Sequence, residues 1–188
     1  IVITATGSDM EIDFETTDHA VVGGVFSAAP ITLNADTVQI DGTTEFESLS
    51  TLTIRPRTPG TSIGIGGGAG TLNLDDIALG TFVDGFSSIA IGDTAAGTGT
   101  VDIDTATFTD PITIAGGTIN DHSGTDIDAA TNSVTLIGNV SPGQSPGVLV
   151  VAGDYAFGTG STFEVEFDVT RHDKVDVTGR VDLNNATL

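Results

Sequence analysis

The chain has 188 residues, with five Lys and Arg against 26 Asp and Glu, which gives a formal net charge of −21 at pH 7. Because so few cationic side chains are available to neutralise phosphates, we expect neither nucleic-acid binding nor attraction to anionic membranes. Hydrophobic residues nevertheless make up 38% of the chain. We therefore expect a folded core and exclude a charge-expanded disordered segment.

The composition favours strands and turns over helices. Thr (30), Gly (25) and Asp (20) are abundant, whereas the good helix formers Lys, Glu, Met and Arg are scarce. The chain has no Cys, which excludes disulfides, thiolate metal ligands and a cysteine nucleophile. An all-β fold follows. Both ends of the sequence resemble strands, so we also expect the chain to be part of a longer protein.

Short strands with the pattern apolar-x-apolar recur along the chain at intervals that average about 20 residues. This interval is about one coil of a parallel β-solenoid. Further short strands are expected between them at 38–40, 63–65 and 101–103. The recurring strands are at 12–14, 31–33, 52–54, 72–74, 89–91, 112–114 and 134–136.

The residue between the two apolar positions of each recurring strand should point away from the core. In stacked coils these residues would form an outer column of small, mostly β-branched side chains. The predicted column consists of Asp13, Thr32, Thr53, Asn73, Ala90, Thr113 and Thr135. Gly-rich stretches would supply the corners of the coils, including 64–69, which superficially matches a dinucleotide-binding fingerprint but is followed by no helix or P-loop lysine.

The pattern predicts a parallel β-solenoid, with an antiparallel β-sandwich as the alternative, because a sandwich also has many short strands separated by turns. Residues 1–137 are expected to form regular coils. After residue 137 the pattern shifts, with two Pro-Gly turns followed by closely spaced strands. Residues 138–188 therefore form either continuing C-terminal coils or a hairpin-rich segment of the same domain.

Two parts of the chain carry a family resemblance. In residues 138–188 the motifs SPG at 141 and 145, GST at 160 and VTG at 177 resemble a repeat of bacterial autotransporter passengers and very large secreted surface proteins. In residues 49–119 the stretches STLTIRP, SIGIGGGAGTLNLDD, DGFSSIAIG and DPITIAGG resemble the upstream coils of filamentous-haemagglutinin-like giant proteins.

The resemblance implies a right-handed parallel β-helix that serves as an extracellular stalk or adhesive surface at the bacterial cell surface. It implies no catalytic residues. The stretch DVTRHDKVDV (168–177) departs from the family pattern, which usually has a Gly/Thr-rich loop there. A loop function carried over from the family is therefore in doubt at this position.

Closely spaced acidic residues are the candidates for a cation site. Two carboxylates at positions i and i+2 of a strand share a face about 6.6 Å apart and repel each other unless water or a cation intervenes. Calcium prefers such oxygen ligands, although the chain has no EF-hand loop. The alternative is a hydrated acidic surface. The candidate calcium ligands are Asp75, Asp76, Asp102, Asp104, Asp126 and Asp128.

No residues stand out for catalysis or for binding an organic cofactor, so we expect the protein not to be an enzyme. The basic cluster Arg171-His172-Asp173-Lys174 is interpreted as a solvated loop with local ion pairs. Each of the three His residues neighbours an Asp, but adjacent strand residues point to opposite faces. The nine Phe and the single Tyr lie mostly in predicted strands and are expected to be core residues.

The sequence thus predicts a non-catalytic structural segment of a large extracellular bacterial surface protein, forming a stalk, a matrix or a filament. The alternatives are a β-helix enzyme that degrades polysaccharide and a module that binds glycan or calcium. Open coil ends predict end-to-end self-association or stacking on flanking coils of the same chain. An extracellular glycan or host surface is the other expected partner, and no membrane insertion is expected.

Overall fold

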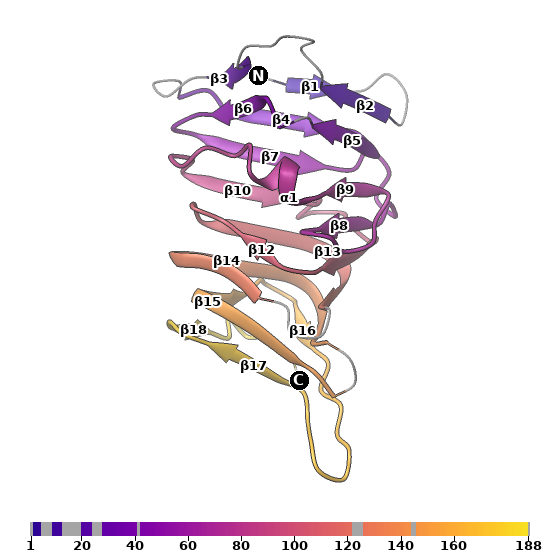
Figure 1. Cartoon of the computed structure of the whole chain (residues 1–188). Helices are drawn as coiled ribbons and strands as arrows, with labels where there is room; N and C mark the ends of the chain where they lie inside the picture. The colour runs from indigo at the N-terminus through magenta and orange to yellow at the C-terminus, as the bar shows by residue number, and fades with distance from the viewer. Residues whose placement is uncertain are drawn as a thin grey trace.

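The computed structural model describes residues 2–4, 9–12, 20–23, 28–40, 42–121, 126–143 and 146–187. Its parallel strands are stacked into a β-solenoid of about seven turns, about 22 residues apart, with almost no helix (Figure 1). The strand ladders form three columns, which we call faces 1, 2 and 3 in the order in which each coil visits them. The predicted all-β solenoid is confirmed.

Face 1 is the column that the sequence pattern detects best, because its strands alternate buried apolar and outward-pointing residues. Its separate strands are β1 (Val2–Thr4), β4 (Ile31–Asn34), β7 (Thr51–Arg55), β10 (Ser88–Ile91) and β18 (Val181–Asp182). Three long strands, β13 (Ile112–Asp121), β14 (Asp126–Ser141) and β15 (Val148–Phe157), contribute one part each to face 1 and continue from or onto a neighbouring face.

Faces 2 and 3 complete each coil. Face 2 contains β2 (Asp9–Ile12), β5 (Thr37–Ile40), β9 (Leu72–Leu74), β8 (Ile63–Ile65), β11 (Thr100–Ile103), the ends of β13 and β14, and β16 (Thr162–Phe163). Face 3 contains β3 (Ala20–Gly23), β6 (Thr44–Glu47), β12 (Ala106–Thr107), the starts of β14 and β15, and β17 (Lys174–Val177). The single-turn helix α1 (Asp76–Leu79) follows β9.

The register of face 1 confirms most of the predicted repeat. Ile31 pairs with Leu52, Leu52 with Ile89, Ile89 with Ile112, and Ile112 with Val134. All five side chains are buried and form part of one continuous apolar core. The outward column is confirmed over the same coils, where the register joins Thr32, Thr53, Ala90, Thr113 and Thr135.

Two members of the predicted repeat belong to a different column. Ile12 lies on face 2, in the β2–β5 ladder, and Leu72 with Leu74 lies on face 2 beside β8. Asp13 lies outside the described residues. The strand at 72–74 therefore does not begin a new coil but is a second face-2 strand of the third coil. This extra strand lengthens that coil. The turns of the solenoid are about 22 residues apart, compared with the predicted 20.

The antiparallel β-sandwich is excluded, since every ladder between the named strands is parallel. In the described part of the chain the one antiparallel bridge joins Phe167 to His172, outside the named strands. Residue 138, where the sequence pattern shifts, lies within β14, and this strand runs on without a break to Ser141. β15, β16 and β17 then continue the three ladder columns.

Candidate functional site

The third coil is irregular because a glycine-rich crossover places two parallel strands side by side on face 2. The loop 66–70 returns the chain so that Ile63 pairs with Leu72 in parallel, with the Gly66 amide donating to the Leu74 carbonyl at 2.9 Å. A Cβ at Gly64 would clash with the carbonyl oxygen of Gly68. Glycine is therefore required for this close approach, and the dinucleotide-like stretch is a structural crossover.

Face 3 loses its ladder at the same level. Residues 81–83 bond to β6, with the Phe46 amide donating to the Thr81 carbonyl at 2.9 Å and the Val83 amide to the Phe46 carbonyl at 3.1 Å. On the other side, β12 pairs with β14. Within the described residues no ladder joins 81–83 to β12. The strand edge of β12 that faces α1 is therefore left without a ladder partner.

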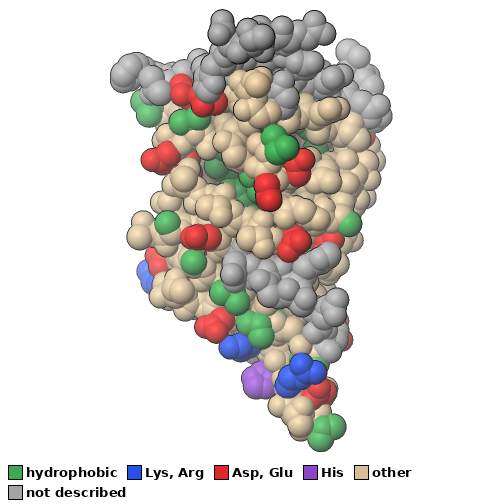
Figure 2. Space-filling view, viewed as in Figure 1, with side chains coloured by type: hydrophobic (Ala, Val, Ile, Leu, Met, Phe, Trp, Pro, Cys, Tyr) green, Lys and Arg blue, Asp and Glu red, His purple; other side chains and the backbone are tan. Residues whose placement is uncertain are grey.

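A pocket of about 470 Å³ lies in this interruption of face 3, and we call it the face-3 pocket. Figure 2 shows hydrophobic atoms recessed in a hollow of this face, with acidic side chains near its edge. The pocket combines an apolar floor with hydroxyl groups and one carboxylate. Its lining residues are Asp76, Leu79, Gly80, Phe82, Ile89, Thr105, Thr107, Phe108 and Thr109.

Two carboxylates that are sequence neighbours of the lining residues Asp76 and Thr109 have defined roles in the fold. The Asp75 side chain caps α1 by accepting from the Ala78 amide at 2.9 Å. Asp110 is buried and accepts from the Gly85 amide at 3.1 Å. Burial raises the pKa of Asp110, and the nearby Asp84 charge adds to this shift. Negative charge at the pocket itself therefore comes from Asp76 in its lining, which is next to Asp75 in the sequence.

A second feature is a hairpin of residues 164–173, which we call the arm, and which projects from the last coil (Figure 1). Its two sides are joined by backbone bonds from Asp168 to the Arg171 carbonyl at 2.9 Å and from Asp173 to the Glu166 carbonyl at 3.0 Å. At the tip, Asp168 Oδ1 accepts from the Thr170 and Arg171 amides at 2.6 and 2.7 Å. These amides lower the pKa of Asp168 and define the turn.

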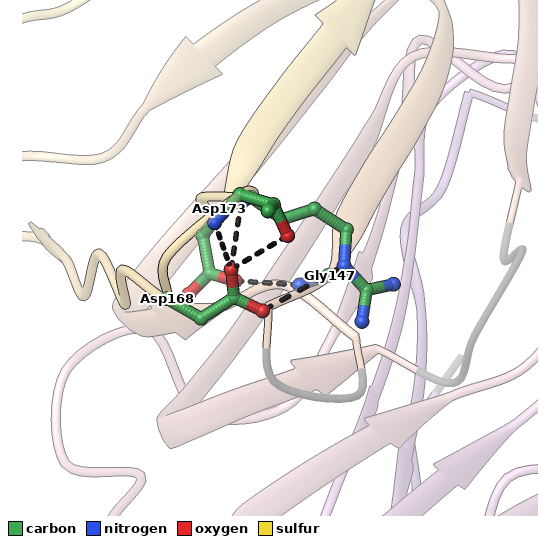
Figure 3. A network of polar contacts seen from close by, with 5 residues as sticks. Gly147, Asp168 and Asp173 are labelled. Atoms are coloured by element: carbon green, nitrogen blue, oxygen red, sulfur yellow. Dashed lines mark hydrogen bonds and ion pairs between the residues drawn. The ribbon is translucent and has the colours of Figure 1, made fainter.

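The base of the arm is fixed to the solenoid by Asp173, whose side chain is buried. One carboxylate oxygen accepts from the Gly147 amide at 2.5 Å and the other from the Glu166 amide at 2.9 Å. Figure 3 shows the contact of Asp173 with Gly147 together with the contacts of Asp168 at the tip. Since Gly147 lies in the turn between β14 and β15, the arm is attached to the preceding coil by a buried carboxylate.

The arm presents apolar side chains to solvent. Phe167 is 78% exposed and Val169 is fully exposed, whereas most other Phe residues of the described chain are buried or half-buried as predicted. The expected local ion pairs are present, between Arg171 and Asp168 at 3.7 Å and between Lys174 and Asp176 at 3.0 Å. Sequence analysis missed the two exposed apolar residues because the alternation in VEFDV is equally typical of a half-buried strand.

The candidate calcium ligands are distributed over three successive coils. Asp75 and Asp76 lie at the start of α1, Asp102 and Asp104 on β11 and directly after it, and Asp126 and Asp128 at the start of β14. Within the described residues no group of three or more acidic or His side chains could hold a metal ion.

Several of these carboxylates bond to backbone amides instead. Asp102 accepts from the Ala69 amide at 2.7 Å, which fixes the glycine crossover to the next coil, and Asp128 accepts from the Ala130 amide at 2.9 Å. Asp126 is described only by its backbone, which pairs with Val150. Calcium binding stays a prediction, and a rise in melting temperature in CaCl₂ that NaCl of equal ionic strength does not reproduce would support it.

The C-terminal end of the solenoid core is open. A pocket of about 330 Å³ lies between the last strands and is lined by apolar side chains. The Tyr155 hydroxyl, buried at this pocket, has no hydrogen-bond partner among the described residues, and burial raises its pKa. The lining residues are Tyr155, Phe157, Phe163, Val175, Val177, Val181, Leu183 and Ala186.

Comparison with known proteins found no matching family model, no matching curated protein and no matching solved structure. No helix in the described part of the chain is both long and apolar enough to cross a membrane. Inferences about function therefore depend on the β-solenoid itself, the face-3 pocket, the arm and the open C-terminal end.

Proposed function

We propose that this chain is a non-catalytic structural segment of a large extracellular bacterial surface protein and acts as a stalk or filament. The observation that carries the proposal is the parallel ladder of face 1, which runs in register through successive coils over a fully buried column of Ile and Leu. The family resemblance of residues 49–119 and 138–188 supports the extracellular location.

The ladders suit this function because each coil bonds mainly to its two neighbours. Buried apolar residues stack along the axis, and outward Thr and Asp side chains keep the long surface hydrated. Side chains also join successive coils: Asp36 accepts from the Thr58 amide and hydroxyl, both at 2.8 Å, and from the Thr61 hydroxyl at 3.0 Å. Such a structure resists extension without requiring a disulfide.

The open C-terminal end supports the partner part of the proposal, which is end-to-end contact with a further β-coil. Val181 and Leu183 are 47% and 63% exposed there, beside the apolar end pocket. A coil stacked on this end would cover these side chains and pair with the edges of β17 and β18, as the described coils pair with one another.

Single-molecule force spectroscopy tests the structural function. With attachment points at residues 31 and 187, we expect successive force peaks, each releasing about one coil, or roughly 7 nm of chain at about 3.4 Å per residue. Extension of the chain without force peaks would contradict the proposal. Turnover of any member of a polysaccharide panel by the same protein would favour the alternative of a β-helix enzyme.

A further inference from the structure

We propose that the face-3 pocket binds an extended basic strand of a partner protein, which adds to the open edge of β12. This inference goes beyond the proposed stalk function, because it describes attachment to the side of the solenoid and not to its end. The pocket lies where the ladder of face 3 is interrupted, and Figure 2 shows it as a hollow on this face. The space, the backbone groups and the charge at this interruption each favour such an occupant.

The interruption leaves space for one strand. Between the levels of β5 and β13, face 2 holds β9, β8 and β11, whereas face 3 holds only residues 81–83 and β12. Neighbouring strands are about 4.8 Å apart, so the second face-2 strand leaves one strand position of face 3 without a ladder. A single extended segment placed there would therefore complete the ladder.

The β12 border of the interruption directs backbone groups toward it. The Phe108 amide donates to the Asp128 carbonyl at 2.7 Å, and Ala106 also pairs with β14. Because alternate residues of a strand direct their amide and carbonyl to opposite edges, Thr107 presents both of its backbone groups to the interruption. Such an edge is a template for a further strand.

The segment 81–83 borders the interruption from the other side. Its Thr81 carbonyl and Val83 amide bond to Phe46 of β6. The Phe82 carbonyl between them therefore faces away from β6, toward the interruption. An added strand would meet an amide and a carbonyl on one border and a carbonyl on the other. Main-chain hydrogen bonds of this kind provide the affinity when a peptide adds to a sheet edge.

Charge complementarity selects a basic occupant. Asp76 lies in the pocket lining, and the strands around the interruption carry further outward acidic side chains: Glu45 and Glu47 on β6 and Asp128 on β14. No Lys or Arg occurs in β6, in residues 81–83, in β12 or at the start of β14. Since an added strand would direct alternate side chains outward, Lys or Arg at those positions would lie among these carboxylates.

The apolar side chains of the pocket have a smaller role in binding. Leu79, Phe82 and Phe108 are already buried in the single chain, so covering them removes little further surface from water. They form a floor on which the inward side chains of the occupant would rest. Binding therefore depends mainly on backbone pairing and on charge, and it should weaken as salt screens the acidic surface.

Fluorescence anisotropy with a synthetic peptide tests the proposal. The probe is a labelled heptapeptide of alternating Lys and Val, titrated with the whole chain at about 0.15 M NaCl. One control peptide has Glu in place of Lys. The other has Pro in place of the central Val, which keeps the charge but removes a strand amide. We expect the Lys-Val peptide to bind at least tenfold more tightly than either control, and equal affinity of the Pro-containing peptide would overturn the proposal.

A matched pair of variants separates binding at the pocket from general attraction to a chain of charge −21. Thr109→Lys adds a positive charge to the pocket lining, and Thr94→Lys adds the same charge in the exposed turn after β10, between faces 1 and 2. Thr109→Lys should weaken binding of the Lys-Val peptide about fivefold, and Thr94→Lys by less than twofold. Equal weakening by the two variants would show non-specific attraction and overturn the proposal.

Thr107→Pro tests the strand edge itself. Proline removes the amide that faces the interruption and leaves the bonds of Ala106 and Phe108 to β14 in place. Binding should fall at least fivefold, and unchanged binding by the folded variant would count against the proposal. The Pro-containing peptide makes the same test without altering the protein, so the proposal can fail even if this variant does not fold. The force measurement on single molecules does not depend on these results, so failure of strand binding and failure of the stalk function are distinguishable.

Discussion

The fifth coil continues the ladders of the solenoid on its faces, whereas the third coil interrupts one of them. Both coils use glycine to change the direction of the chain. In the fifth coil, β13 turns from face 1 to face 2 at Ala115–Thr118, where the register shifts, and both halves pair with the next coil. In the third coil, the glycine-rich crossover returns the chain to face 2 and adds β9 beside β8. An added strand on one face is thus accompanied by an interrupted ladder and a pocket on another.

This comparison separates two roles of glycine in one fold. Gly116 and Gly117 lie at a corner where the carbonyls of the preceding coil leave no room for a Cβ, and the coil stays regular. Gly64 and Gly70 instead allow backbone to pack on backbone within the third coil, and Gly66 and Gly68 allow this coil to pack closely on the backbone of the next one. A regular coil requires glycine at the corner, whereas the irregular coil requires it throughout the crossover.

The largest expected effect comes from Gly66→Ala, which tests whether the third coil depends on its crossover. Gly66 has φ +61°, and a Cβ there would clash with the Thr105 carbonyl of the next coil. We expect a loss of about 4 kcal/mol in the free energy of unfolding, from overpacking together with left-handed strain. Urea denaturation measures it.

The control for this variant is Gly160→Ala. Gly160 also has a positive φ, +79°, but a Cβ there would meet no atom within 4 Å. Gly160→Ala should therefore lower the free energy of unfolding by only about 1 kcal/mol, which is the strain of a left-handed backbone at a residue with a Cβ. If Gly66→Ala and Gly160→Ala lowered the free energy of unfolding equally, close packing at Gly66 would contribute nothing to stability.

The next largest expected effect is the stability lost when a valine is truncated in a closed coil, compared with the same change in the open C-terminal coil. Val151 and Val177 pair in register on adjacent coils, but Val151 is fully buried and Val177 only half-buried. Val151→Ala should cost about 2.5 kcal/mol and Val177→Ala about 1 kcal/mol, because only the first leaves a closed cavity. Thermal and urea unfolding check both values, and a larger loss for Val177→Ala would contradict the open-end description.

A smaller effect concerns the side-chain connection between regular coils. Hydrogen bonds from the Thr58 amide, and from the Thr58 and Thr61 hydroxyls, lower the pKa of Asp36. Asp36→Ala should cost about 1.5 kcal/mol at pH 7. Because the pKa is lowered in the folded state, this contribution is present above the unfolded pKa near 4 and disappears as the pH falls through the folded value.

Asp93→Ala is the matched control for Asp36, since the Asp93 side chain accepts from amides two and three residues away, at Ala95 and Ala96. Its loss should be smaller, because no second coil is involved. Unfolding measured from pH 7 to pH 2 gives both the size and the pH dependence of the loss. An Asp36→Ala loss that stays constant below pH 3 would contradict the role of the ionised carboxylate.

The smallest effect has the opposite sign. Burial raises the pKa of Asp110, so the ionised carboxylate is unfavourable in the folded state above that pKa. Asp110→Asn keeps an acceptor for the Gly85 amide and should stabilise the protein by about 0.5 kcal/mol at pH 7. The gain should vanish below the unfolded pKa near 4, and Asp84→Asn, at an exposed position, should give a smaller gain. Destabilisation by Asp110→Asn at pH 7 would contradict this interpretation.

Much of the fold was predictable because its signal is local and repeated. Alternation in strands such as ITL at 31 and LTI at 52 identifies the buried side of each strand, and the similar spacing of the strands indicates stacking. The assignment of LNL at 72 to its own coil was wrong, since an isolated apolar-x-apolar triplet does not specify its column. The column that this strand joins depends on the close backbone packing that the glycines of the crossover allow.

The candidate sites were less predictable. The basic cluster at 171–174 was identified as a loop with local ion pairs, but its projection from the body depends on Asp173 bonding to the distant Gly147 amide. The face-3 pocket brings together residues of α1, β10 and β12, whose sequence neighbours give no sign of a cavity. Pairs of acids at i and i+2 are frequent, so spacing alone could not show which of them bond to amides.

The sequence by itself determined the all-β class, the stacking of about one coil per 20 residues and the acidic, Thr-rich exterior, since these follow from side-chain alternation and composition. Only the tertiary structure decided which face each strand joins, where the ladder is interrupted and which apolar residues remain exposed. The physical reason is that alternation specifies inside and outside along one strand, whereas neighbouring strands are chosen by backbone approach and by hydrogen bonds between residues more than 20 positions apart.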